Sequence, residues 1–392
     1  ITVAPLLDVG GKFSLASQSG TYVAQTVNFL HKNGIVLNKA ISVGNEANID
    51  LTDCLEYLGN DDTTRAIGLY IEGIRDARRF LGVARKVSRT KPIIAQYVGG
   101  TEAGARSGSS HTGAMAGPDY VYDGLFEQAG IIRVDTIEEV FKTGWALATQ
   151  PPLQGRRIAV LTNSGGPGTG ISTTCNAHGL EVPEFSKPLQ ERISQYLPGH
   201  ASARNPVDLT FHVNMDALSE KIPRELFESD EIDGIIIHGI MDTAFMGLLY
   251  PYLKEYINVN EEDFLKNAEI SLDALLQMPG DYKKPLMISS FFGREDHCIR
   301  VFHENDVPVF DSPEKAARAM AGLYKHLHIR TRTLSDPDGS EPEPSNAQAI
   351  MQKQQTHLMN TRQRNCYRHT GFPQQPKSWQ QALNRLRKVQ MR

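Results

Sequence analysis

The chain has 392 residues, 40% hydrophobic and 22% charged, which is typical of a globular protein with two or three domains. It contains no apolar run near the roughly 18 residues of a membrane helix and no secretory signal pattern at its start, so we expect neither a membrane span nor export. The four scattered cysteines lack metal-binding or disulfide spacing, which predicts no metal site and a reducing, cytoplasmic location.

Apolar strands alternate with amphipathic helices through the first 150 residues. We predict strands at 13–17, 39–43, 66–71, 92–98 and 131–134. We predict helices at about 22–31, 51–58, 76–87, 120–129 and 137–149. Such alternation is typical of a parallel sheet that is covered by helices on both faces.

The same pattern starts again near Arg157. A strand at 157–162 is followed by the turn NSGGPG and a helix, as the strand at 13–17 is followed by QSG and a helix. The segment AIGLYIEG resembles DGIIIHG, and KPIIAQYVGG resembles KPLMISSFFG. We therefore predict two copies of one α/β domain, over residues 1–150 and 151–330, the second with an insertion near 245–282.

Beyond about Arg330 the periodicity stops. Residues 345–392 hold nine Lys or Arg and no Asp or Glu, whereas the preceding residues carry 45 acidic and 32 basic side chains. We expect residues 331–392 to be a linker and a disordered tail, because they have too few apolar residues for a core. We expect the acidic body to have no nucleic-acid partner. The first residue, Ile1, suggests a fragment of a longer reading frame.

One loop, GARSGSSHTGAMAGP over Gly104–Pro118, carries a single histidine, His111, among small residues. Read alone, it is either a surface linker or a mobile loop that brings an imidazole to a site as nucleophile, base or ligand. The second copy has only the short, charged segment GREDHC at the corresponding place. That asymmetry favours an added loop with a function.

Both Ser-Gly turns come directly after a strand and before a helix. In parallel sheets this edge binds ligands, and the free N–H groups and dipole of a helix start favour an anion such as phosphate. Two helix starts that point at one place would stabilise a phosphate on His111. Glu72, at the end of a strand, either orients that imidazole or is a solvated carboxylate, and the residues alone leave both readings open.

Six short motifs occur along the chain in the order in which one protein family carries them. They are SQSG, SVGNEANID, LYIEGIRDARRF, SGSSHTGAMAG, TNSGGPG and RNPVDLT. Over roughly residues 10–330 the chain thereby resembles the NDP-forming acyl-CoA synthetases, in particular the ADP-forming acetyl-CoA synthetases, relatives of succinyl-CoA synthetase. The resemblance implies two succinyl-CoA-synthetase-like flavodoxin-type domains in tandem, each a Rossmann-like three-layer α/β fold with a parallel sheet. From the repeated order of landmarks in the two copies, we predict that their Ser-Gly turns face a shared cleft.

The resemblance also implies the site. His111 would be phosphorylated in passing between an acyl phosphate and ADP, with Glu72 as its supporting carboxylate. The phosphate would be held by the two helix starts, at Ser19, Gly20, Ser164, Gly165, Gly166 and Gly168. The implied enzyme is an acid–CoA ligase (ADP-forming), which interconverts acyl-CoA, ADP and phosphate with carboxylic acid, ATP and CoA.

The family also uses a CoA-binding domain, an ATP-grasp domain, CoA, ATP or ADP, and Mg²⁺. No GxGxxG precedes Phe13, and residues 331–392 do not resemble a nucleotide-binding domain. We therefore expect this chain alone to be inactive, and to work in an oligomer with domains or subunits that bind nucleotide and CoA. Codons can be chosen for residues 358–373 so that the adjacent reading frame encodes a segment like the start of the family's ATP-grasp domain. We therefore hypothesise that the tail is a frameshift product.

Two other functions compete with the enzyme. One is the regulatory synthetase-like region of a protein lysine acetyltransferase, which would have no chemical need for the SHTGAMAG segment. The other is a two-domain protein that binds small molecules, which would account for the duplicated domains and not for the histidine loop.

Overall fold

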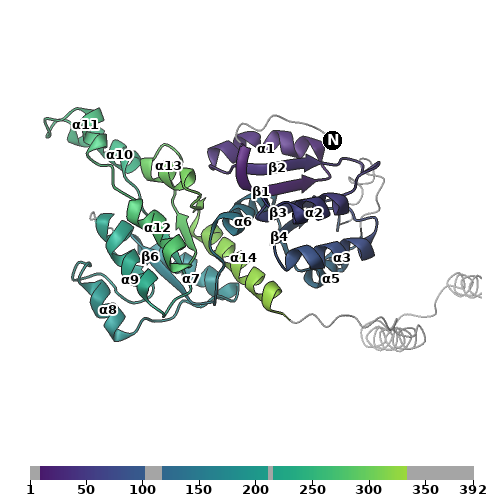
Figure 1. The fold of residues 1–392 in the computed structure, drawn as a ribbon. Helices are drawn as coiled ribbons and strands as arrows, with labels where there is room; N and C mark the ends of the chain where they lie inside the picture. The colour runs from purple at the N-terminus through teal and green to yellow at the C-terminus, as the bar shows by residue number, and fades with distance from the viewer. Residues whose placement is uncertain (1–8, 102–116, 211–214, 333–392) are drawn as a thin grey trace, which may run out of the picture. The chain divides into compact units, whose positions relative to one another are not determined.

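The computed structural model describes residues 9–101, 117–210 and 215–332, which form two five-stranded parallel sheets with helices (Figure 1). The tail prediction for 331–392 therefore falls, but for its first two residues, outside the described residues. No helix in the described ranges is long and apolar enough to cross a membrane.

The first sheet follows the predicted strands closely. Its strands are β1 Val9–Ser17, β2 Leu37–Ser42, β3 Ala66–Ile71, β4 Ile93–Tyr97 and β5 Ile131–Arg133. Their order is β2-β1-β3-β4-β5, and every pair is parallel. This is the flavodoxin order, in which the chain reverses direction across the sheet between β1 and β3.

Helices cover both faces of this sheet because successive strand residues point to opposite sides. The helices α1 Gly20–Lys32 and α6 Ile137–Thr149 pack on the face that carries Phe13 and Leu15. The helices α2 Leu51–Asn60, α3 Ala77–Ser88 and α5 Asp119–Ala129 cover the face of Ile67 and Leu69. The sheet is therefore buried on both sides, which is why its strands read as continuous apolar runs.

The second sheet repeats this topology. Its strands are β6 Ile158–Thr162, β7 Val207–Asp208, β8 Gly234–His238, β9 Leu286–Ser289 and β10 Val309–Phe310. Their order, β10-β9-β8-β6-β7, is the order of the first sheet read from the other edge. The duplication inferred from the sequence is thus a duplication of topology.

The second sheet also has helices on both faces. The helices α7 Gly165–Ala177 and α14 Pro313–Thr331 cover one face. The other face carries α8 Lys187–Ser194, the π-helical turn η1 Ala217–Lys221, α9 Ile222–Glu228, α12 Asp273–Tyr282 and α13 His297–Glu304.

The expected insertion near 245–282 needs a finer description. The helices α10 Thr243–Leu253 and α11 Glu261–Lys266 contain no buried residue and so add nothing to the core. Helix α12, by contrast, buries Leu275 and Met278 against the second sheet. It is the crossover helix between β8 and β9, so only the part before it stands outside the common fold.

Helices α6 and α14 approach each other closely at Gly322. A Cβ built on Gly322 would lie 2.7 Å from Thr143 Cγ2. In α3, a Cβ on the exposed Gly82 would meet nothing within 4 Å. Gly82→Ala should therefore raise the free energy of unfolding by about 1 kcal/mol through helix propensity, whereas overpacking at Gly322→Ala should cancel or reverse that gain. Urea unfolding of the two variants checks this, and equal gains would contradict the close approach.

Candidate functional site

The two Ser-Gly turns share one hydrogen-bonding pattern. Ser17 Oγ donates to the carbonyl of Ser19 at 2.9 Å and accepts from its backbone N–H at 3.1 Å. Thr162 Oγ1 makes the same two bonds to Ser164, at 2.7 and 3.0 Å. In each copy the last hydroxyl of the first strand thus fixes the residue that precedes the helix.

These two helices begin with free backbone donors. Neither N-cap serine makes a side-chain cap bond with a described residue, and neither first turn contains an acidic residue. Helices α2 and α6, by contrast, both begin with capping boxes. In the described part of the chain, no side chain pairs with the N–H groups at the starts of α1 and α7, and these groups and the positive end of the helix dipole together suit an anion.

The glycines of the second turn differ in their surroundings. A Cβ on Gly166 would meet nothing within 4 Å, so this backbone is open to approach. A Cβ on Gly168 would lie 2.8 Å from Thr162 Cγ2, so this glycine lets α7 pack closely on β6. A Cβ on Gly165 would lie 3.0 Å from an Asp208 carboxylate oxygen.

Glu72 lies directly after β3 and is half-buried. Its backbone N–H is bound at 2.5 Å by Gln18 Oε1 from the turn after β1. Its carboxylate makes no hydrogen bond or ion pair with a described residue. His111 lies outside the described residues, in the segment between β4 and α5, so its distance from Glu72 stays a prediction.

Gln18 and Glu46 complete this part of the site, and the sequence analysis did not single them out. Gln18 Oε1 accepts from Gly73 at 3.1 Å, and its amide nitrogen donates to the Gly73 carbonyl and to Glu46 Oε1, both at 2.8 Å. Glu46 Oε1 also accepts from Leu51 N at the start of α2, at 2.9 Å. The sequence signal was that Gln18 belongs to the SQSG motif and Glu46 to the SVGNEANID motif.

Gln18, Glu72 and the Ser-Gly turn before α1 lie where β1 and β3 end side by side, at the point where the strand order of the first sheet reverses. Open α/β sheets bind ligands in this crevice. Tyr22 of α1 and Tyr70 of β3 meet here with ring centroids 4.8 Å apart. Burial, then the charge of Glu72, raises the pKa of Tyr70 to about 12, so its hydroxyl keeps its proton near neutral pH.

The second copy differs at this point. Strand register pairs Ser17 with Tyr70 and Thr162 with His238, so His238 corresponds to Tyr70. The sequence comparison had instead set His238 against Glu72. His238 is buried, bonds Ser289 Oγ at 3.0 Å, and has its pKa lowered by burial to about 4. The second copy therefore lacks a carboxylate equivalent to Glu72.

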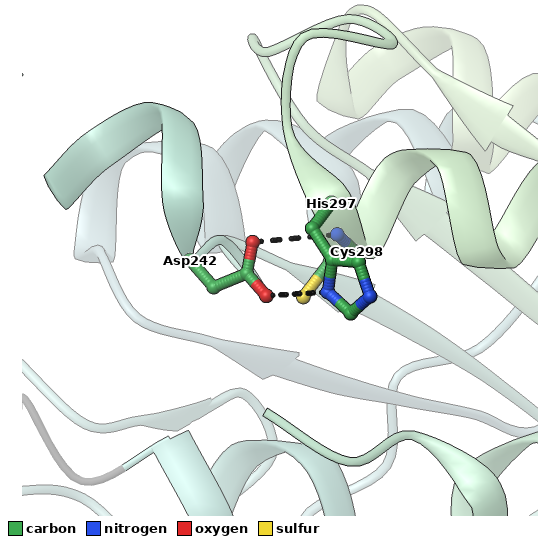
Figure 2. Close-up of side chains that lie close together, drawn as sticks. All are labelled: Asp242, His297 and Cys298. Carbon is green, nitrogen blue, oxygen red and sulfur yellow. Dashed lines mark hydrogen bonds and ion pairs between the residues drawn. The ribbon is translucent and has the colours of Figure 1, made fainter. Parts of the chain in front are cut away.

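Among the described residues, one group has side chains suited to a metal, Asp242, His297 and Cys298 (Figure 2). Asp242 accepts from His297 Nδ1 at 2.9 Å and from the Cys298 backbone at 3.4 Å, and also from the Thr243 and Ile270 backbones. Burial raises the pKa of the Cys298 thiol, which opposes the thiolate that a metal needs. The cluster is accounted for as a hydrogen-bonded link between the starts of α10 and α13.

A cavity of about 220 Å³ lies elsewhere, where β5, α6, α7 and α14 meet. Charged side chains line it, among them Arg133, Glu139, Arg318 and Lys325. Neither Glu72 nor either Ser-Gly turn reaches it, so it is separate from the predicted site.

Known proteins resemble most of the chain. Residues 10–147 match the family described as succinyl-CoA ligase like flavodoxin domain. The alpha subunit of acetate–CoA ligase [ADP-forming] II from Pyrococcus furiosus is 41% identical over 316 residues, 80% of this chain and 65% of the relative. Acetate–CoA ligase [ADP-forming] I from Archaeoglobus fulgidus is 30% identical over 347 residues, 88% of this chain and 46% of the relative.

A solved structure agrees with these relatives. The dinucleotide forming acetyl-coenzyme A synthetase 1 of Ca. Korarchaeum cryptofilum, in complex with phosphate and ADP, matches with a TM-score of 0.67 and 28% identity over 82% of this chain and 66% of that one. The chain thus spans about half to two thirds of the length of these relatives. With six motifs in order and two flavodoxin-like sheets, it belongs to the NDP-forming acyl-CoA synthetases.

Proposed function

We propose that this chain is the phosphohistidine core of an acid–CoA ligase (ADP-forming), which interconverts acyl-CoA, ADP and phosphate with carboxylic acid, ATP and CoA. One observation carries the proposal. The uncapped start of α1 lies at the β1/β3 switch point with the carboxylate of Glu72, which has no partner among the described residues, and β4, which leads to His111, ends beside them.

In this proposal His111 carries the phosphoryl group. A ring nitrogen attacks the phosphorus of an acyl phosphate, so an N–P bond forms while the P–O bond to the acyl group breaks and the carboxylate leaves. The phosphoryl group then passes to ADP. This divides one displacement into two. Glu72 accepts a hydrogen bond from the other ring nitrogen and fixes the tautomer.

We propose that the starts of α1 and α7 share the charge of the phosphoryl group in a common cleft. Each offers free N–H groups and no acidic side chain in its first turn. A helix dipole contributes about 0.3–1 kcal/mol at an exposed site and more when buried. Gly166 leaves room for a close approach to its backbone, whereas Ser164, Gly165 and Gly168 set the path of the turn.

We propose that separate CoA-binding and ATP-grasp domains or subunits bind CoA and the nucleotide with its Mg²⁺. Relatives such as the Pyrococcus furiosus protein are named as alpha subunits, which supports a partner subunit. Three cysteines, Cys54, Cys175 and Cys298, are buried and free, which supports a reducing, cytoplasmic location. We do not propose the acetyltransferase alternative, because the relatives are named as ligases.

The test follows the phosphoryl group directly. The full chain is incubated with labelled acetyl phosphate, and separately with labelled ATP, Mg²⁺ and an ATP-grasp subunit of an ADP-forming relative. We expect an acid-labile, base-stable label that mass spectrometry places on His111. A chain that takes no label from either donor would contradict the proposal.

A further inference from the structure

We infer that Gln18 and Glu46 are positioning residues that hold Glu72 in place for the reaction at the histidine. The inference rests on the proposed function, since it takes Glu72 as the partner of His111. The sequence motifs alone assign this role to neither residue. The contacts between the loops after β1, β2 and β3 assign it.

The amide of Gln18 clamps the segment that carries Glu72. Its oxygen accepts from the backbone N–H groups of Glu72, at 2.5 Å, and Gly73, at 3.1 Å. Its nitrogen donates to the Gly73 carbonyl at 2.8 Å. Three bonds thus tie the backbone after β3 to the turn that starts α1, so the carboxylate and the phosphate-binding turn share one rigid support.

Glu46 in turn fixes Gln18. The Gln18 nitrogen donates to Glu46 Oε1 at 2.8 Å, and that oxygen also accepts from Leu51 N at 2.9 Å. Arg75 Nε lies 3.7 Å from Glu46 Oε2, and its guanidinium donates to the Glu46 and Asn45 carbonyls, both at 2.7 Å. The loops after β1, β2 and β3 are thereby joined.

Gln18 and Glu46 are buried, and each polar atom of their side chains has a partner. Gln18 and Glu46 are both 5% exposed. A helix N-terminus, an amide and a guanidinium surround the Glu46 charge, so the carboxylate is compensated where it lies. A buried polar network whose members are all satisfied holds one conformation, which fits a role in positioning.

The second copy serves as an internal control. Asn163 stands where Gln18 stands in the first copy, and its Oδ1 is buried with no hydrogen-bond partner among the described residues. The second sheet nevertheless has the same strand order and the same Ser-Gly turn. The fold therefore does not require the clamp, and the clamp occurs in the copy that carries Glu72.

Small errors in position have large effects on rate. A displacement of about 1 Å at a reacting centre costs on the order of 100-fold. Without the clamp, the half-buried Glu72 would lose the fixed backbone on which its carboxylate depends. The predicted effect is thus on the rate of phosphoryl transfer rather than on folding alone.

The test is a double-mutant cycle on the full chain with labelled acetyl phosphate as probe. Gln18→Asn is one methylene too short to clamp and should slow labelling of the histidine by up to about 100-fold, and by no more than Glu72→Gln does. In a Glu72→Gln background it should slow labelling no further. Ser14→Ala is the matched control, since Ser14 lies on β1, the strand that leads to Gln18, and loses a buried 2.8 Å bond to Thr64 away from the site; it should change the labelling rate less than about twofold.

A second measurement guards against loss of folding. Urea unfolding of Gln18→Asn, alone and combined with Glu72→Gln, should show a folded chain at the urea-free condition of the assay, so that a slower labelling rate reports on position and not on an unfolded fraction. If Glu72→Gln slows labelling, and Gln18→Asn slows it by the same further factor in the Glu72→Gln background as in the parent chain, the positioning role is wrong while the proposed function stands. If Glu72→Gln has no effect, the proposed role of Glu72 is overturned and the positioning role with it.

Discussion

His111→Ala leaves no acid-labile phosphoprotein, which is the largest functional effect that we expect. Removing a nucleophile takes away the covalent route altogether, so the labelling rate from acetyl phosphate should fall at least about 1,000-fold. Glu72→Gln keeps the nucleophile and should slow labelling about 10- to 100-fold, because the neutral amide no longer stabilises the charged imidazole. The measurement is the amount of label that survives alkaline treatment and is lost in acid, followed over time for each variant.

A second histidine provides the control for this prediction. His200 is exposed, lies in the loop between α8 and β7, and takes no part in the proposed site. His200→Ala should keep the full labelling rate. Label that persists in His111→Ala, or that disappears in His200→Ala, would contradict the assignment of the nucleophile.

The sequence predicted the fold well because the fold rests on apolar periodicity. Parallel strands such as β3 are buried on both faces, so they appear as unbroken apolar runs flanked by turn residues. The predicted ranges agree with the described elements of the first sheet to within a few residues. Strand β7 was missed, since its two residues, Val207–Asp208, are too short to show any period.

The sequence predicted less of the site. Local motifs identified the Ser-Gly turns and Glu72, because turn residues and a terminal carboxylate are visible in one segment. The bond between Gln18 and Glu46 joins residues 28 apart, and the bond from Gln18 to Glu72 joins residues 54 apart. These pairs depend on strand order and on hydrogen bonds between loops, for which a single sequence carries no periodic signal.

Register explains the one local comparison that failed. The segments AIGLYIEG and DGIIIHG look alike because both are apolar strands that end in a polar residue and glycine. In the structure, however, His238 pairs with Thr162 in the sheet, as Tyr70 pairs with Ser17. Two apolar runs with similar ends can therefore be aligned in more than one way, because shifting one run by a residue or two leaves its apolar pattern unchanged. The pattern alone does not show which residues occupy equivalent positions in the two sheets.

Acid should destabilise this chain well above the pH at which carboxylates titrate. His238, His303 and His326 are at most 8% exposed, and burial is the main cause that lowers their pKa values, to about 4, about 3 and about 4. Neighbouring charges act in addition: Arg294 and Lys142 lower the pKa of His303, Arg330 lowers that of His326, and Glu314 raises that of His238.

The direction of the pH effect on stability follows from the pH at which the folded and the unfolded chain bind protons. The unfolded chain takes up a proton at each histidine near pH 6.5, whereas the folded chain does so only near pH 3 to 4. The stability from the neutral buried rings is therefore complete above about pH 6.5 and is lost as the pH falls toward the folded values. Each ring contributes a slope of up to about 1.4 kcal/mol per pH unit, so three give up to about 4 kcal/mol per unit.

Urea unfolding at pH 7, 6 and 5 measures this slope, and His303 offers the sharpest variant. Its ring packs edge-on against Trp145 with centroids 5.7 Å apart, and its Nδ1 is buried without a partner among the described residues. His303→Phe keeps a ring there and removes the titration, so it should reduce the slope by about a third, while His200→Gln on the surface should leave it unchanged. An unfolding free energy that stays flat from pH 7 to 5 would contradict the burial of these rings, because a native state that binds protons as readily as the unfolded chain has no slope.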